Sequence, residues 1–276
     1  MNLSDILNID KEKLIQSNSI KKQIEKIEEE KKILLPSGSK NIDNVLNGGF
    51  RSGNEILIFG SNKTGKTQLC HQICVQAFKI FSKKREKFNK KSSKFTWYLD
   101  LENTFRPERI KQIAIARNLN YNEVFKSINV AKIMSNSALL LKLKFLEDQE
   151  PLEKENVLII DSINNYYRSE QGNKDISFHK IKTTYLKILK KINELTKKLN
   201  LITILTAQVA PNFVKGAIIK EIPVGNQYLN HFFKEYLYLN VKGEEYSYIH
   251  LVNSQLFPEK KKLYKITSEG IIDCKI

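Results

Sequence analysis

Cysteine, arginine and long apolar runs are all scarce in this sequence. Three cysteines, Cys70, Cys74 and Cys274, occur among 276 residues, too few and too unevenly spaced for a disulfide framework, which fits a reducing compartment. No stretch approaches the ~18 consecutive apolar residues that cross a bilayer, and residues 1–10 lack the basic and apolar regions of a secretory signal. The sequence therefore predicts a soluble, intracellular protein without a membrane partner.

Arginine stands at only six positions, so lysine supplies nearly all of the positive charge: 46 Lys+Arg against 30 Asp+Glu leave a formal net charge of +16. Lysine suits phosphate backbones as a mobile point charge, whereas the planar fork of arginine usually reads guanine edges. Two interpretations stay open: a polyanionic partner bound with little sequence preference, and a compositional drift that merely solvates the surface. The hydrophobic content of 41% supplies a core and excludes a wholly disordered basic chain.

Length and texture divide the chain into a short segment and one large domain. Residues 1–35 are charged and helical in pattern, and the run Glu28 to Lys32 predicts one exposed helix. That segment is too short to be a domain. Residues 36–276, where Pro36 and the glycines at Gly48-Gly49 mark a change of texture, form the expected core domain.

In the core domain strand-like and helix-like segments alternate, which predicts an α/β fold with a mostly parallel sheet and helices on both faces. The strand-like runs are short, continuous and branched or aromatic, as in strands buried on both faces. From Tyr236 onward only strand patterns remain, so we expect an antiparallel extension to close the domain. The expected strands are 56–59, 95–99, 157–160 and 201–205, and the expected helices are 68–78, 108–119, 137–146 and 181–199.

A phosphate-binding loop is the strongest motif in the sequence. Residues 60–67 match G-x-x-x-x-G-K-[ST] and lie between a strand-like run and a helical pattern, the context that the motif requires. The glycines let the loop curl so that its amides surround the β-phosphate, Lys66 would reach the β/γ oxygens, and Thr67 would ligate Mg²⁺. ATP and Mg²⁺ are the expected cofactors. The expected nucleotide-binding residues here are Gly60, Ser61, Asn62, Lys63, Thr64, Gly65, Lys66, Thr67 and Gln68.

Two carboxylates follow buried strand patterns and complete the expected chemistry. Asp161 ends the apolar run Val157 to Ile160, which places it at the carboxyl edge of a strand as a second Mg²⁺ ligand. Glu102 follows the run Phe95 to Leu99 and is the candidate base for water. A surface acid or helix cap is the alternative for Glu102.

Other patterns invite chemistry but have simpler interpretations. Cys70, His71 and Cys74 share a helical segment, but zinc needs four ligands and no second pair lies nearby in the sequence. We interpret the cysteines as small core residues. The lysine-rich stretch Lys79 to Lys94 would link the phosphate-loop helix to the next strand, and we interpret it as a solvated surface loop, with binding of a second DNA duplex as the alternative. The lysines of the 181–199 helix are interpreted as a solvated face.

Several segments around these motifs share a pattern with a known family. The segments are Gly38-Ser39-Lys40 with Asp43, Gly48-Gly49, Thr67 to His71, Glu102 to Ile110, Leu158 to Ser162 and Tyr167-Arg168. Together they resemble the RecA/RadA-type strand-exchange recombinases in their archaeal and eukaryotic branch. The resemblance runs from about Pro36 to the C-terminus and implies a RecA-like P-loop NTPase core.

The resemblance also implies roles for individual residues. Glu102 would polarise the attacking water and Gln208 would sense the γ-phosphate, which with Lys66 makes the expected catalytic set. Arg109 would stack on adenine, His231 would relay the nucleotide state, and Pro258 would act on the ATP of a neighbouring subunit. Two loops, at about 168–179 and 209–227, would hold single-stranded DNA. The expected DNA contacts are Arg168, Lys174, His179, Phe213 and Lys215, with loop packing as the alternative role for Phe213.

The sequence departs from the family pattern in places. No counterpart of the family's N-terminal helix-hairpin-helix domain precedes Pro36, and Ile20 to Gln23 is the nearest approach to its Phe-x-x-Ala docking motif. The first DNA loop lacks the expected arginines after Glu170, and Asn253 replaces the acidic residue that caps ATP. These differences concern strand exchange more than ATP binding.

The resemblance implies a DNA-dependent ATPase that assembles as a homo-oligomer or filament on single-stranded DNA, engages duplex DNA and promotes homologous pairing in recombinational repair. Two alternatives stay open. One is a reduced paralogue that binds ATP and assists a full-length recombinase without exchanging strands, and the other is a RecA-fold regulatory or motor ATPase. The expected location is the nucleus in a eukaryotic host and the cytoplasm in an archaeal one.

Overall fold

A computed structural model describes residues 32–87, 94–148, 156–243 and 245–274. The chain divides into two units, which are Met1–Ile33 and Leu34–Ile276. The helix predicted within residues 1–35 lies almost wholly outside the described residues, and the two residues Leu34–Leu35 form a short strand instead. Among the described helices, none combines the length and apolarity needed to cross a bilayer.

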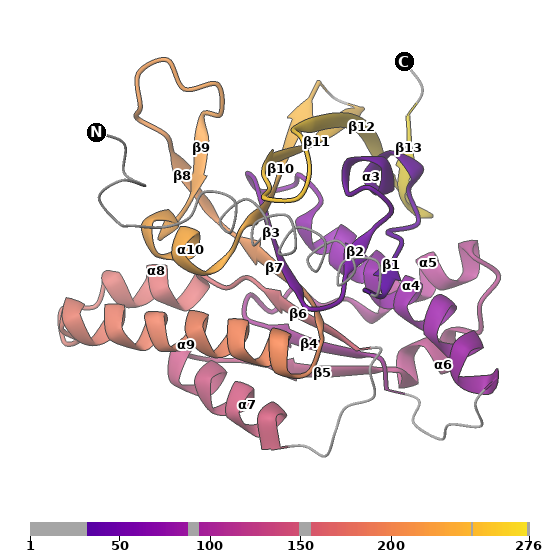
Figure 1. Cartoon of the computed structure of the whole chain (residues 1–276), viewed down its shortest axis with the longest axis horizontal. Helices are drawn as coiled ribbons and strands as arrows, with labels where there is room; N and C mark the ends of the chain where they lie inside the picture. The colour runs from indigo at the N-terminus through magenta and orange to yellow at the C-terminus, as the bar shows by residue number, and fades with distance from the viewer. Residues whose placement is uncertain (1–31, 88–93, 149–155, 244, 275–276) are drawn as a thin grey trace, which may run out of the picture. The chain divides into compact units, whose positions relative to one another are not determined.

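A nine-stranded mixed sheet forms the centre of the larger unit (Figure 1). Its order is β13-β12-β11-β10-β3-β7-β6-β4-β5. The strands from β10 to β5 pair in parallel, and β10 to β13 pair antiparallel. The bounds are β3 (Asn54–Phe59), β4 (Thr96–Asp100), β5 (Ile128–Lys132), β6 (Val157–Asp161), β7 (Ile202–Ala207), β10 (Glu235–Lys242), β11 (Tyr246–Asn253), β12 (Lys260–Thr267) and β13 (Gly270–Asp273). The predicted α/β fold, with its antiparallel C-terminal extension, is confirmed.

Two short two-stranded sheets accompany the central one. β1 (Leu34–Leu35) pairs antiparallel with β2 (Phe50–Arg51). β8 (Val209–Pro211) pairs antiparallel with β9 (Glu221–Pro223), and the two strands make a hairpin that extends away from the central sheet (Figure 1).

Helices cover both faces of the sheet, as the alternating sequence pattern predicts. On one face, α7 and α9 lie beside each other, with α8 and α10 toward one end; α4, α5 and α6 lie on the other side (Figure 1). The bounds are α3 (Lys40–Val45), α4 (Lys66–Lys87), α5 (Pro107–Ala116), α6 (Tyr121–Lys126), α7 (Asn136–Asp148), α8 (Asn165–Gln171), α9 (Phe178–Lys198) and α10 (Asn226–Phe232).

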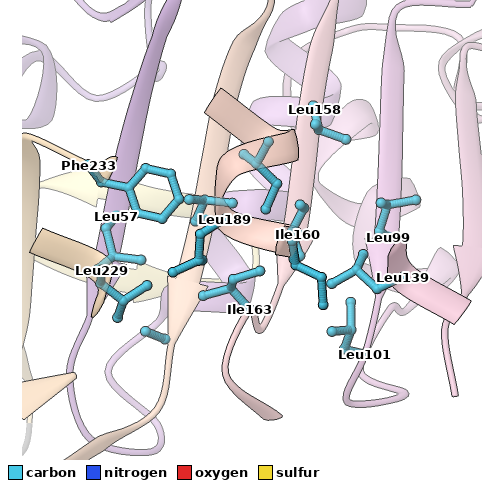
Figure 2. Packing of buried hydrophobic residues seen from close by; sticks show 14 of the residues in the cluster. Leu57, Leu99, Leu101, Leu139, Leu158, Ile160, Ile163, Leu189, Leu229 and Phe233 are labelled. Carbon is cyan, nitrogen blue, oxygen red and sulfur yellow. The ribbon is translucent and has the colours of Figure 1, made fainter. Parts of the chain in front are cut away.

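The main hydrophobic cluster lies between the sheet and the α7–α10 face. Leu57, Leu99 and Ile160 from three strands meet Leu139 of α7 and Leu189 of α9, all fully buried (Figure 2). All residues of β6 and β7 are buried, which explains the continuous apolar run Val157 to Ile160 in β6 and the mostly apolar sequence of β7. Burying one large apolar side chain contributes ~1.5–3 kcal/mol to the free energy of unfolding, so this cluster is the principal source of stability.

One prediction of loop structure is wrong. The lysine-rich stretch Lys79 to Lys94 was expected to link a helix to a strand, but α4 continues to Lys87. Phe81 of this extension is fully buried and its ring lies 6.2 Å from that of Phe95, centroid to centroid. The apolar residues of the extra turns therefore keep the helix on the sheet despite the lysines between them. Residues 88–93 lie outside the described part of the chain.

Candidate active site

The loop Gly60–Thr67 joins the carboxyl end of β3 to the start of α4. Gly60 has φ +151°, and a Cβ there would lie 2.1 Å from the carbonyl oxygen of Leu239. Lys63 adopts φ +66°. Glycine at the first position lets the loop pass close under the neighbouring strand. The Lys66 ammonium folds back over the loop and donates to the carbonyls of Gly60 (2.7 Å) and Ser61 (3.0 Å), where phosphate oxygens would compete for it.

Strands from the C-terminal extension form one wall of this loop. A Cβ on Gly65 would lie 2.7 Å from Cδ1 of Ile266, and the Tyr264 hydroxyl donates to the carbonyl of Thr64. Arg109 of α5 reaches the same wall, where it donates to the carbonyls of Thr267 and Ser268. Segments about 200 residues apart therefore hold the loop in one conformation.

A cleft of about 760 Å³ opens beside the loop. Its size suits a nucleotide-sized ligand. Of the predicted nucleotide-site residues, those lining the cleft are Asn62, Lys63, Gly65, Lys66, Thr67, Gln68, Glu102 and Arg109; Thr104, Ile266 and Thr267 also line it and were not predicted. Gly60, Ser61 and Thr64 belong to the loop but are not part of the lining. Pro258 is exposed in the turn between β11 and β12, so its predicted action on a neighbouring subunit stays a prediction.

Hydroxyl groups surround the Asp161 carboxylate at the end of β6. Oδ2 accepts from Tyr98 (2.7 Å) and Thr67 (2.8 Å), with Thr104 at 3.4 Å. Oδ1 accepts from Thr206. Thr67 lines the cleft, and the buried Asp161 carboxylate lies directly behind its hydroxyl and is not itself part of the lining. This pair of oxygen ligands fits Mg²⁺, which typically takes one or two carboxylates and completes its shell with phosphate oxygens and water.

The cysteines and His71 on α4 do not form a metal centre. Cys70 and Cys74 are fully buried free cysteines, and burial raises the pKa of both thiols. Burial also lowers the pKa of His71 to about 4, so its Nε2 is an acceptor, and it receives the backbone N–H of Arg106 at 3.1 Å. No group of three or more metal-ligating side chains of these types occurs within the described residues.

Burial and charge act in opposite directions on Lys66. Burial lowers the pKa of its ammonium, while the carboxylates of Asp161 and Glu102 raise it. The carboxylates thus favour the charged form of the buried ammonium, which is the form that attracts a phosphate.

Glu102 lies in a hydrogen-bonded chain that leads out of the cleft. Its Oε1 accepts from the Ser162 hydroxyl and from Nε2 of Gln208 at 2.9 Å. Oε1 of Gln208 in turn accepts from Arg168 at 3.0 Å. Gln208 is held at its backbone by Asn164, which accepts from the Gln208 N–H at 2.9 Å. The structure thereby brings together three predicted residues that are far apart in the sequence.

The predicted DNA-binding residues fall into two groups on the surface. Arg168 on α8, Lys174 in the following loop and His179 in the first turn of α9 are exposed. Phe213 and Lys215 lie in the exposed 212–220 loop of the β8–β9 hairpin, where Phe213 is 91% exposed. This exposure argues against the loop-packing alternative for Phe213.

The hairpin loop also exposes apolar residues that were not predicted. Val214 and Ile218 are 69% and 93% exposed. At the base of the hairpin, Glu221 accepts from the hydroxyl of Ser61 in the phosphate loop, so the hairpin and the loop are in contact. His231 is exposed on α10, and its relay role stays a prediction.

Sequence reasoning missed the hydroxyl groups around Asp161. Tyr98 belongs to the run Phe95 to Leu99, which looks like uniform core, and Thr206 lies just beyond the predicted end of its strand. One signal was available. Tyr98 lies two residues before Asp100, so alternation along the strand puts both side chains on the same face of the sheet. Asp100 ends its strand as Asp161 ends the neighbouring one, with which it is in register.

Comparisons with known proteins place this geometry in context. The Rad51 family model matches residues 28–274. A protein named DNA repair protein RAD51 homolog 1, from Arabidopsis thaliana, is 28% identical over 250 residues, which is 88% of this chain and 70% of the relative. The Drosophila melanogaster DNA repair protein Rad51 homolog is 27% identical over 247 residues, 88% of this chain and 71% of the relative. The Zea mays RAD51 homolog B is 27% identical over 251 residues, with 88% and 70% covered.

Proposed function

The chain belongs to the Rad51 family, and from that premise we propose that it is an ATP-dependent, DNA-binding recombinase. It assembles on single-stranded DNA, engages duplex DNA and promotes homologous pairing and strand exchange in recombinational repair. The named relatives are DNA repair proteins from plants and an insect, which favours the nucleus over the cytoplasm as its location.

The cleft supports the ATPase part of this proposal. Lys66 and the loop amides bind the phosphates, and Arg109, which also lines the cleft, packs against the base. Thr67 and Asp161 would hold Mg²⁺, which would supply charge neutralisation at the phosphates. Glu102 orients and deprotonates the attacking water.

The single observation that carries the proposal is the chain Glu102–Gln208–Arg168. In this arrangement Gln208 occupies one oxygen of the candidate base, and exposed Arg168 holds Gln208. A DNA phosphate that binds Arg168 competes for this contact, because a charge-assisted bond to phosphate is stronger than one to a neutral amide. Release of Gln208 then frees Glu102 for water, so that DNA stimulates hydrolysis.

The experiment measures ATP hydrolysis with and without single-stranded DNA for the wild type and Lys66→Ala. We expect hydrolysis that DNA stimulates in the wild type and loss of both rates in the variant. Gln208→Ala removes the group that occupies Glu102, so hydrolysis without DNA should rise toward the DNA-stimulated rate and DNA should stimulate it no further. A wild type that stays monomeric with ATP and DNA, and hydrolyses ATP at a rate indifferent to DNA, contradicts the filament model.

The reduced paralogue is a second candidate, and a specific observation favours it. The loop after Arg168 presents Lys174 as its one lysine between α8 and α9, so this loop has few cations for DNA. A strand-exchange assay with and without a full-length recombinase separates the two functions, since the paralogue exchanges no strands itself and only assists exchange by that partner. DNA binding without salt dependence contradicts both and favours a regulatory or motor ATPase.

A further inference from the structure

The hydroxyl of Tyr98 lies against the carboxylate that would hold Mg²⁺. It donates to Oδ2 of Asp161 at 2.7 Å, and the Tyr98 and Asp161 side chains are 0% and 1% exposed. Thr67 donates to the same oxygen at 2.8 Å, and Thr206 donates to Oδ1. Three of these donors come from different elements, β4, α4 and β7, so the carboxylate is held from three directions.

The Tyr98 ring is itself fixed by its neighbours. It packs edge-on against Phe105, with centroids 4.9 Å apart, and stacks on His71 at 5.8 Å. His71 accepts the backbone N–H of Arg106 at 3.1 Å. The ring is therefore clamped between α4 and the segment that follows Glu102. An aromatic ring has only two side-chain torsions, and close packing on both sides leaves the hydroxyl one position.

Thr67 and Thr206 alone are less able to fix the orientation of Oδ2 of Asp161. Thr67 is the one of the two that lines the cleft and is needed for the metal, since a hydroxyl that donates its proton to Asp161 keeps its lone pairs for a cation. Thr206 holds only Oδ1. Thr104 reaches Oδ2 only at 3.4 Å, whereas Tyr98 reaches it at 2.7 Å and has no role toward the cation, so the orientation of Oδ2 depends chiefly on Tyr98.

We propose that Tyr98 is a positioning residue for magnesium: its hydroxyl holds Oδ2 of Asp161 in the orientation in which that oxygen and Thr67 serve one Mg²⁺ together. The inference rests on the proposed nucleotide site. Partners behind metal ligands fix ligand orientation, and their loss typically lowers metal affinity about 10–100-fold.

The test is Tyr98→Phe, which removes one oxygen and keeps the ring. Binding of a fluorescent ATP analogue to the full chain is titrated with MgCl₂ and, separately, measured in EDTA. We expect the Mg²⁺ concentration for half-maximal effect to rise about tenfold, while affinity in EDTA stays within about twofold of the wild type. The matched control is Tyr185→Phe, since the Tyr185 hydroxyl is also buried but has no hydrogen-bond partner among the described residues; its Mg²⁺ dependence should equal that of the wild type.

Thermal unfolding without metal reports whether Tyr98→Phe is folded. If it is not, Thr206→Val carries the test, because it removes the donor to Oδ1, and a rise in the Mg²⁺ requirement supports the same positioning of Asp161. An unchanged Mg²⁺ requirement in the folded variant overturns the inference, and so does an equal loss of affinity in EDTA, which marks a purely structural role. A wild type that binds no nucleotide contradicts the proposed function instead.

Discussion

Glu55 is a buried acid whose protonation should make stability depend on pH. It lies on β3 with 8% exposure, and its Oε1 accepts from the side-chain amide of Asn193 at 3.1 Å. Burial raises the pKa of this carboxyl from 4.5 to about 7. The charge of Lys197 and the bond from Asn193 oppose the shift without cancelling it.

The sign follows from proton linkage. Between pH 4.5 and 7 the folded protein keeps a proton on Glu55 that the unfolded chain has released, so the free energy of unfolding falls as pH rises. The difference between 4.5 and about 7, at 1.36 kcal/mol for each unit, corresponds to about 3 kcal/mol lost by pH 8. Glu55→Gln cannot ionise and removes this contribution.

Urea unfolding at pH 5, 6, 7 and 8 measures the effect. We expect the Glu55→Gln curve of unfolding free energy against pH to rise relative to the wild type, from near equality at pH 5 to an advantage of up to about 3 kcal/mol at pH 8. Glu194→Gln, a change to an exposed glutamate on α9, is the control and should leave the pH dependence of the wild type intact. Parallel curves for the wild type and Glu55→Gln would refute the reasoning.

Three further substitutions test other parts of the structure. Gly60→Ala places a Cβ 2.1 Å from the carbonyl of Leu239 at φ +151°, so a thermal-shift assay should show a lower melting temperature and a loss of stabilisation by ATP. Phe213→Ala, at a side chain 91% exposed, should leave melting unchanged and weaken single-stranded DNA about 5- to 100-fold in anisotropy titrations, the worth of one stacked base; unchanged affinity would remove Phe213 from the DNA site. Leu189→Ala opens a cavity in the core and should lower the urea-unfolding free energy by about 2–5 kcal/mol, whereas a loss below 1 kcal/mol would contradict the packing described.

The parallel core was predictable because strands that are buried on both faces appear in the sequence as short apolar runs. The run Val157 to Ile160 is continuously apolar and fully buried, and it forms all of β6 except the final Asp161. β5 was missed because Ile128 is its one buried residue and because it lies at the edge of the sheet, where Val130 is 42% exposed. An edge strand has a partner on one side only, so its sequence is under weaker constraint.

The phosphate loop was readable from the sequence because its chemistry depends on contiguous residues. The surroundings of Asp161 were not, since Tyr98 and Thr206 reach it from two other strands. The contact between Gln208 and Arg168 likewise depends on how β7 and α8 are placed. Resemblance suggested separate roles for these residues, and the fold connects them.

The support that Tyr264 gives to the carbonyl of Thr64 joins residues 200 positions apart. On a ribosome that adds about 5–20 residues each second, the phosphate loop leaves the tunnel roughly 10–40 s before β12 exists to hold it. A nascent chain at this stage also lacks the cleft wall that Ile266 and Thr267 supply, so we expect ATP to stabilise its early strands less than those of the finished domain. Nucleotide can act fully as a folding ligand only after synthesis is nearly complete, so an interrupted chain would present an unsupported loop to chaperones and proteases.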